Sequence, residues 1–86
     1  MNINELIAIV KNKLESEIII QDLQIEDKSF LHKNHKGHQE GKFHLKLIIS
    51  SDELAKTSKI SSTKRIYSIL DLELKEYIHS IQILFN

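Results

Sequence analysis

The sequence of 86 residues contains no cysteine and no proline, and it has no excess of charge of either sign. The absence of cysteine excludes disulfides, thiol catalysis and a metal site built from the chain's own thiolates. The 12 basic and 12 acidic residues balance to a formal net charge of zero, whereas a dedicated nucleic-acid binder usually has a basic excess. Nucleic-acid binding by this chain would therefore depend on a local patch.

Long apolar runs are also missing. No stretch approaches the ~20 apolar residues that a membrane span needs. The first seven residues lack the basic region of a signal peptide, and Glu5 interrupts their apolar run. We therefore expect no membrane span and, by default, a cytoplasmic location, although an organellar chain whose targeting peptide has been removed would look the same. The length and the hydrophobic content of 41% are typical of one small globular domain, which we place over residues 1–86.

Hydrophobic periodicity predicts a helix and then a strand in the first third of the chain. Apolar residues recur on one stripe of residues 3–16, as in an amphipathic helix, and Asn2 can cap this helix with Glu5 three positions further on. Residues 18–27 combine a β-branched run with alternation, which favours a strand. Residues 28–41 have no sustained periodicity and contain both glycines, so we expect a long loop there.

Alternation is clearest over residues 42–50. The apolar side chains of the odd-numbered residues point to one face, and His44, Lys46 and Ser50 point to the other. This pattern is typical of a half-buried antiparallel strand, and His44 is interpreted as a structural residue on its polar face. Residues 51–52, Ser-Asp, then open a turn or a short helical piece.

Two helices and a strand are expected in the last third. A helix that Ser61 or Ser62 can cap is predicted to run to about Leu70, and a shorter one follows over residues 71–77, capped by its first residue. Residues 78–85 predict the last strand, in which Ile81, Ile83 and Phe85 alternate with Ser80, Gln82 and Leu84.

The predicted order is helix, strand, strand, helix pair, strand. A sheet of only three strands buries a core when helices cover one of its faces. We therefore predict an α+β fold in which a three-stranded mixed sheet is covered on one face by helices.

Five segments, taken in order, resemble the BolA-like family. They correspond to that family's first strand-to-strand loop, its second strand with a Ser-Asp turn, its central helix, and the two parts of its closing E-L…[IV]-H-[AS]-[LI] signature. The matching residues are 27–37, 44–52, 66–70, 73–74 and 78–81. The likeness covers nearly the whole chain, and it runs without a gap from the second of these segments through the third.

The resemblance implies a fold similar to the type II KH domain, with the order α-β-β-α-α-β. It also implies a heterodimer with a monothiol glutaredoxin that holds a 2Fe-2S cluster, in iron–sulfur trafficking and iron homeostasis. The isolated chain would then be a colourless monomer without a cofactor, because imidazoles alone rarely hold a cluster. Some family members are described as transcription regulators, so a DNA-binding regulator is the alternative.

Two ligand positions are implied by the same resemblance. One is His79, in the closing signature, and the other is a histidine of the first loop, best matched by His32 and less well by His35 or His38. Thiolates of glutaredoxin and glutathione would be the remaining ligands. Neutral imidazole can replace thiolate on one iron, as in Rieske centres. Without the family, His79 is read as bonding a backbone carbonyl, and the loop histidines as solvated surface; an adaptor that binds no metal then remains open.

A basic segment lies around the predicted central helix. Lys56, Lys59, Lys64 and Arg65 form either a phosphate-contacting patch or simply a solvated helix face. BolA-like proteins typically carry an Arg-His-Arg triplet where residues 62–64 read Ser-Thr-Lys, and their usual glycine is absent near Lys56. The Gly-X-X-Gly loop of nucleic-acid-binding KH domains is absent as well. These departures weaken the DNA-binding alternative.

Sequence patterns typical of enzymes are missing. The chain has no glycine-framed nucleophile, no glycine-rich phosphate loop and no paired carboxylates in a context that would form a pocket. We therefore expect a binding module without catalytic residues.

Overall fold

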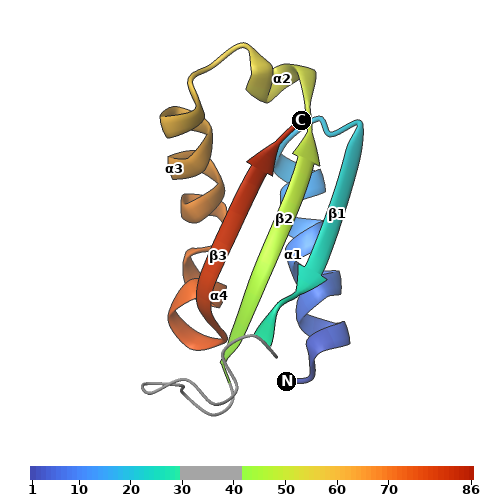
Figure 1. Ribbon diagram of the computed structural model, residues 1–86, viewed down its shortest axis with the longest axis vertical. Helices are drawn as coiled ribbons and strands as arrows, with labels where there is room; N and C mark the ends of the chain where they lie inside the picture. The colour runs from blue at the N-terminus through green and yellow to red at the C-terminus, as the bar shows by residue number, and fades with distance from the viewer. Residues whose placement is uncertain (30–41) are drawn as a thin grey trace.

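The computed structural model describes residues 1–29 and 42–86. Its elements are α1 (Ile3–Glu17), β1 (Asp22–Asp27), β2 (Phe43–Ser50), α2 (Asp52–Ala55), α3 (Lys59–Ile69), α4 (Asp71–Glu76) and β3 (Ile78–Phe85). The central strand β2 is antiparallel to β1 and parallel to β3 (Figure 1). The predicted α+β order and the mixed three-stranded sheet are confirmed, and the short helical piece after β2 is α2.

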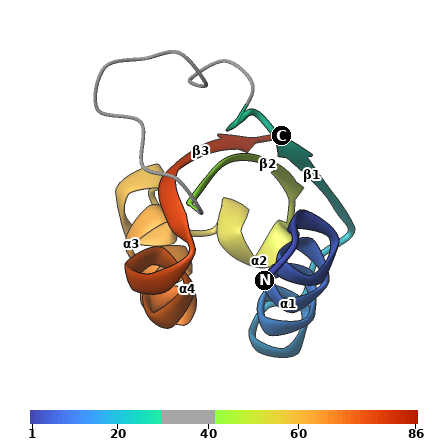
Figure 2. The same cartoon turned by 90° about the horizontal axis from the view of Figure 1, so that it is seen from below.

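The helices cover one face of the sheet. Figure 2 shows α1 and the α3–α4 pair side by side beneath it, with α2 between them at one end. The core lies between these two layers, and among the described residues it consists of eleven buried apolar side chains: Leu6, Val10, Leu14, Ile18, Leu45, Leu47, Ile49, Leu54, Ile66, Leu70 and Ile78. The opposite face, which we call the outer face, carries no helix among the described residues. Within residues 1–29 and 42–86, no helix is long and apolar enough to cross a membrane.

Helix α1 forms as its sequence predicts. The Asn2 side chain caps the first turn by accepting a hydrogen bond from the Glu5 N–H at 2.8 Å. Its amide also donates a hydrogen bond to the Glu5 carboxylate at 2.9 Å, which links the two side chains. The predicted apolar stripe packs against the sheet, and its Leu6, Val10 and Leu14 are fully buried.

The prediction of a strand from residue 18 is wrong, because β1 begins only at Asp22. Ile18 ends α1 instead, and its N–H donates to the Leu14 carbonyl at 2.9 Å. The backbone of Ile19 then bonds side chains around α2: its N–H donates to Glu53 at 3.3 Å and its carbonyl accepts from Ser51 at 2.7 Å. Tertiary hydrogen bonds thus replace the sheet pairing that the β-branched run suggests.

The helix caps in the last third also differ from the prediction. Ser58, not Ser61 or Ser62, caps α3 by accepting from the Ser61 N–H at 3.1 Å. Ser62 lies inside the helix and is buried. Asp71 is the first residue of α4 rather than its cap, and Leu70 occupies the cap position without a side-chain bond. Several neighbouring serines can serve as caps, and packing selects among them.

Candidate functional site

The site predicted at His79 lies at an irregularity in the pairing of β3 with β2. Phe43 pairs with Ile78, but the next residue of β2, His44, pairs with Ser80. His79 is therefore an extra residue in β3, which is the definition of a β-bulge. Because of the bulge, Ile78 points into the core while both His79 and Ser80 are exposed. A regular strand would send one of two successive side chains inward.

The bulge brings two imidazole rings together. The rings of His44 and His79 are stacked, with their centroids 4.8 Å apart and their planes at 25°. Nδ1 of His44 lies 2.7 Å from the hydroxyl of Ser80. His44 lies on the outer face as predicted, but it is only 6% exposed. The sequence prediction missed this contact, although His79 and Ser80, two polar residues in succession between Ile78 and Ile81, interrupt the alternation at the bulge.

The backbone of His44 also anchors the start of the segment that follows β1. Its N–H donates to the hydroxyl of Ser29 at 3.0 Å, and its carbonyl accepts from the Lys28 N–H at 2.7 Å. Ser29 in turn donates its N–H to the Asp27 carboxylate at 2.9 Å. Lys28 and Ser29 therefore lie directly beside His44.

The three loop histidines predicted as ligands, His32, His35 and His38, lie outside the described residues. Their assignment as metal ligands therefore stays a prediction. Within residues 1–29 and 42–86 there is no group of three or more His, Cys, Asp or Glu side chains that could hold a metal ion.

The ring nitrogens of His79 make no hydrogen bond with the described part of the chain, and its side chain is exposed. The alternative reading, a bond from His79 to a backbone carbonyl, is not seen there. Taken alone, the described residues offer a metal a single accessible imidazole. This donor set fits a shared site, in which other ligands come from a partner or from residues 30–41, and it does not fit a metal centre held by the described residues alone.

A hollow on the outer face adjoins the stacked rings. Its lining residues come from the end of β1 and from β2 and β3: Lys28, His44, Leu45, Lys46, Ser80, Ile81 and Gln82. Lys28 forms an ion pair with Glu26 at 2.9 Å. The hydrogen bond from Lys28 and its positive charge hold the pKa of the Glu26 carboxyl below its ordinary value, and the charge of Lys46 adds to this effect. Lys28 and Lys46 thus bring two ammonium groups to the hollow, and Glu26 pairs with the first of them.

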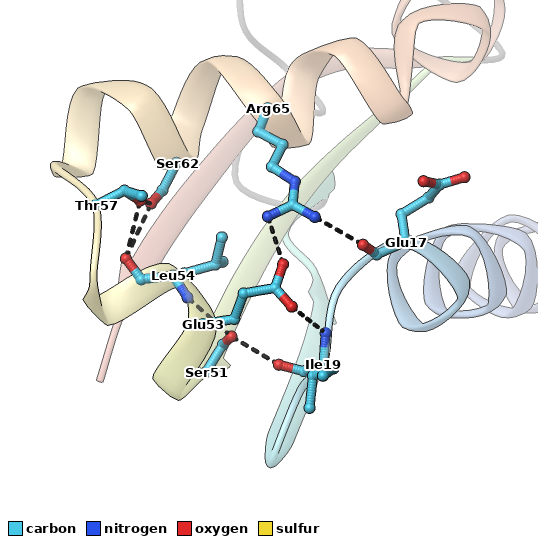
Figure 3. Close-up of polar contacts among 8 residues, drawn as sticks. All are labelled: Glu17, Ile19, Ser51, Glu53, Leu54, Thr57, Ser62 and Arg65. Carbon is cyan, nitrogen blue, oxygen red and sulfur yellow. Dashed lines mark hydrogen bonds and ion pairs between the residues drawn. The ribbon is translucent and has the colours of Figure 1, made fainter.

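Arg65, one of the predicted nucleic-acid contacts, is exposed but bonded to other residues of the chain (Figure 3). One guanidinium nitrogen lies 2.5 Å from the Glu53 carboxylate on α2, and another donates to the Glu17 carbonyl at the end of α1 at 2.7 Å. Glu53 also accepts from the Ile19 N–H. We call this set the Arg65–Glu53 clamp, since it ties α1, α2 and α3 together. The guanidinium of Arg65 is thus already bonded to two groups of the chain, the Glu53 carboxylate and the Glu17 carbonyl.

The predicted basic residues do not share one face. Lys59 and Lys64 are both exposed on α3, but five positions at about 100° per residue set them about 140° apart around the helix. Lys56 lies at the end of α2. Lys59, Lys64 and Arg65 therefore point in different directions, although each was expected to contribute to the same surface.

Comparison with known proteins agrees with the resemblance in the sequence. The family described as "BolA-like protein" matches residues 14–85. SufE-like protein 1, chloroplastic/mitochondrial, of Arabidopsis thaliana is 32% identical over 79 residues; the match covers 86% of this chain but only 21% of that protein. The DNA-binding transcriptional regulator BolA of Haemophilus influenzae is 32% identical over 73 residues, with 85% of this chain and 68% of the relative covered. The chain thus spans about a fifth of the first relative and about two thirds of the second.

Solved structures extend the likeness to the fold. The BolA domain of SufE1 from Arabidopsis thaliana superposes with a TM-score of 0.77 at 32% identity, covering 92% of this chain and 87% of that domain. BolA1 from the same plant gives 0.76 at 23% identity, with 91% and 86% covered, and this second match supports the fold alone. With the family match extending over most of its length, the chain belongs to the BolA-like protein family.

Proposed function

We propose that this chain is a non-catalytic binding module that partners a monothiol glutaredoxin and coordinates a 2Fe-2S cluster with it, in iron–sulfur trafficking and iron homeostasis. The observation that carries the proposal is His79, an exposed imidazole held at a β-bulge on the outer face. Imidazole nitrogen is a common metal ligand, and this one makes no hydrogen bond with the described residues.

The ligand inventory supports a shared site. The chain has no cysteine, so thiolates for the cluster come from glutaredoxin and glutathione. The chain supplies His79 and one histidine of the first loop, with His32 the first candidate and His35 the second. Imidazole in place of thiolate on one iron raises the reduction potential of such a centre. The isolated chain is then a monomer without a cluster.

The charge beside His79 is of the right sign for this role. Thiolate ligands carry negative charge, and Lys28 and Lys46 line the hollow next to the His44 ring. Opposite charges at an interface speed encounter and select the partner. A partner that brings thiolates to His79 would therefore meet a complementary surface.

Co-expression with a monothiol glutaredoxin tests the proposal. The expected result is co-purification of the two chains as a coloured heterodimer with visible absorbance from the cluster, while the chain alone purifies colourless. The matched control is Gln24→Ala, at an exposed position of β1 on the same face of the sheet and outside the hollow; it should leave the colour unchanged, whereas His79→Ala should remove it. A colourless wild-type mixture, or a chain that is brown on its own, would contradict the proposed ligand set.

The second candidate is a DNA-binding regulator. Its specific support is the relative from Haemophilus influenzae, whose name is DNA-binding transcriptional regulator BolA. Against it stand the neutral net charge, the engagement of Arg65 in the Arg65–Glu53 clamp and the separation of the lysines around α3. We therefore rank it below the glutaredoxin-partner function.

A further inference from the structure

We propose that His44 is a positioning residue for His79: its buried ring is the platform on which the His79 ring is stacked. The assignment rests on the proposed function, in which His79 is a ligand. His44 itself needs no direct contact with the cluster to act in this way.

Proximity comes from the bulge. In a parallel pair without a bulge, a residue of β2 faces a single residue of β3 on the same side of the sheet. Here the extra residue lets both His79 and Ser80 reach His44, the first by its ring and the second by its hydroxyl. The contact thus depends on backbone geometry that the rest of the ladder, from Leu45 to Ile49, holds in register.

The geometry of the stacked rings leaves the nitrogens of His79 able to bind a metal. Stacking covers one face of an aromatic ring, whereas an imidazole binds a metal through a nitrogen lone pair that lies in the ring plane. With the planes at 25° and the centroids 4.8 Å apart, His44 restrains the tilt of the His79 ring without lying in that plane. Stacking on His44 therefore leaves the edges of the His79 ring, where its two nitrogens lie, uncovered by the described residues.

The platform is itself held in place. The Nδ1–Ser80 hydrogen bond fixes the rotation of the His44 ring, and backbone bonds to Lys28 and Ser29 fix the strand beneath it. An exposed side chain normally loses rotamer freedom when it binds. Stacking on a fixed ring removes part of that freedom beforehand, and such preorganisation strengthens binding without adding a contact to the ligand.

The first test uses the chain alone and the χ1 rotamer of His79, read from NMR scalar couplings. In the wild type we expect one dominant rotamer. His44→Leu fills a similar volume without a ring and should give rotamer averaging, whereas His44→Phe keeps a flat ring and should restore the single rotamer. Ser80→Ala removes only the hydrogen bond at an exposed position and should give an intermediate result. Thermal unfolding of each variant checks that the domain is folded.

The second test loads the same variants with a cluster as the glutaredoxin heterodimer and measures visible circular dichroism and the rate of cluster loss. His44→Leu should lose the cluster roughly two- to tenfold faster, the range that an aromatic pair contributes, and His44→Phe should be close to wild type. Identical His79 rotamers in wild type and His44→Leu would overturn the platform. If no cluster forms even with the wild type, the proposed function fails, and the rotamers of the isolated chain still decide whether His44 positions His79.

Discussion

Lys13 on α1 and Glu73 on α4 form an ion pair across 60 residues of sequence, with the lysine nitrogen 2.7 and 3.0 Å from the two carboxylate oxygens. The two partners differ in burial, since the Glu73 side chain is 4% exposed and that of Lys13 is 39% exposed. Glu73 belongs to the family's closing signature, and the structure gives it a role in joining two helices rather than in binding a ligand.

This asymmetry predicts unequal effects of removing either partner. Lys13→Met leaves a buried carboxylate without its cation and should lower the free energy of unfolding by about 2–3 kcal/mol. Glu73→Gln removes the charge but leaves a lysine that reaches water, and should cost about 1–2 kcal/mol. Urea denaturation followed by circular dichroism measures both values. Equal losses, or a larger loss for Glu73→Gln, would contradict the assignment of the carboxylate as the buried partner.

The Arg65–Glu53 clamp predicts a pH-dependent contribution to stability. The hydrogen bond from Arg65, then the Ile19 N–H, hold the pKa of the Glu53 carboxyl below its ordinary value of 4.5. A carboxyl whose pKa is lowered by folding stabilises the folded state above its unfolded pKa, and this contribution is lost as the pH falls through the lowered pKa. Glu53→Gln should therefore destabilise the chain at pH 7.

The difference in stability between the wild type and Glu53→Gln should shrink progressively below about pH 4.5, the ordinary pKa of the Glu53 carboxyl. Thermal melts from pH 7 to pH 2 follow it. Arg65→Gln serves as the companion variant, because it removes the other member of the pair and should show the same narrowing. A gap between wild type and Glu53→Gln that is constant over this range would argue against the clamp.

The histidines should differ in how replaceable they are as ligands. His79 is fixed by the bulge, so His79→Ala should abolish or strongly destabilise the cluster of the glutaredoxin heterodimer. His32→Ala, His35→Ala and His38→Ala should each have a smaller effect, with His32→Ala the largest, because three histidines of one segment can substitute for one another. Visible circular dichroism of each reconstituted heterodimer measures this, with Gln24→Ala, outside the hollow, as control. An unchanged spectrum for His79→Ala would remove that residue from the ligand set and favour an adaptor that binds no metal.

Replacing all three loop histidines together should alter the spectrum and the reduction potential of the cluster, because a different ligand must take the vacant position. The domain should stay folded in this triple variant, because residues 1–29 and 42–86 already form an apolar core of their own. Far-ultraviolet circular dichroism of the chain alone provides the control for folding.

DNA binding by the isolated chain should be weak and without sequence preference. With Arg65 engaged in the clamp, Lys56, Lys59 and Lys64 remain, and three phosphate contacts limit the slope of log K against log salt to no steeper than about −3. Fluorescence anisotropy with DNA duplexes of different sequence, over a range of salt concentrations, measures the slope. A sequence-specific complex that persists at physiological salt would place the DNA-binding regulator first.

The sequence by itself determined the elements whose cause is local. The apolar stripe and the Asn2 cap specify α1, and the alternation over residues 80–85 specifies most of β3, because periodicity matches the geometry of a helix or strand one residue at a time. The ordered motifs were also sufficient to identify the BolA-like family, and with it His79 as the residue to examine. The order of elements then limits a small domain to one sheet covered on one face.

Tertiary structure decided what depends on partners distant in the chain. Strand β1 begins at Asp22 and not at residue 18 as predicted, because the backbone of Ile19 bonds side chains around α2. The environment of His79 depends on a bulge that only the pairing of β3 with β2 reveals. The sequence does not show that Arg65 is paired, but Glu53, twelve residues away, forms an ion pair with it. Hydrogen bonds and stacking between distant segments leave no periodic trace, so the sequence identifies these residues while the fold decides what each one contacts.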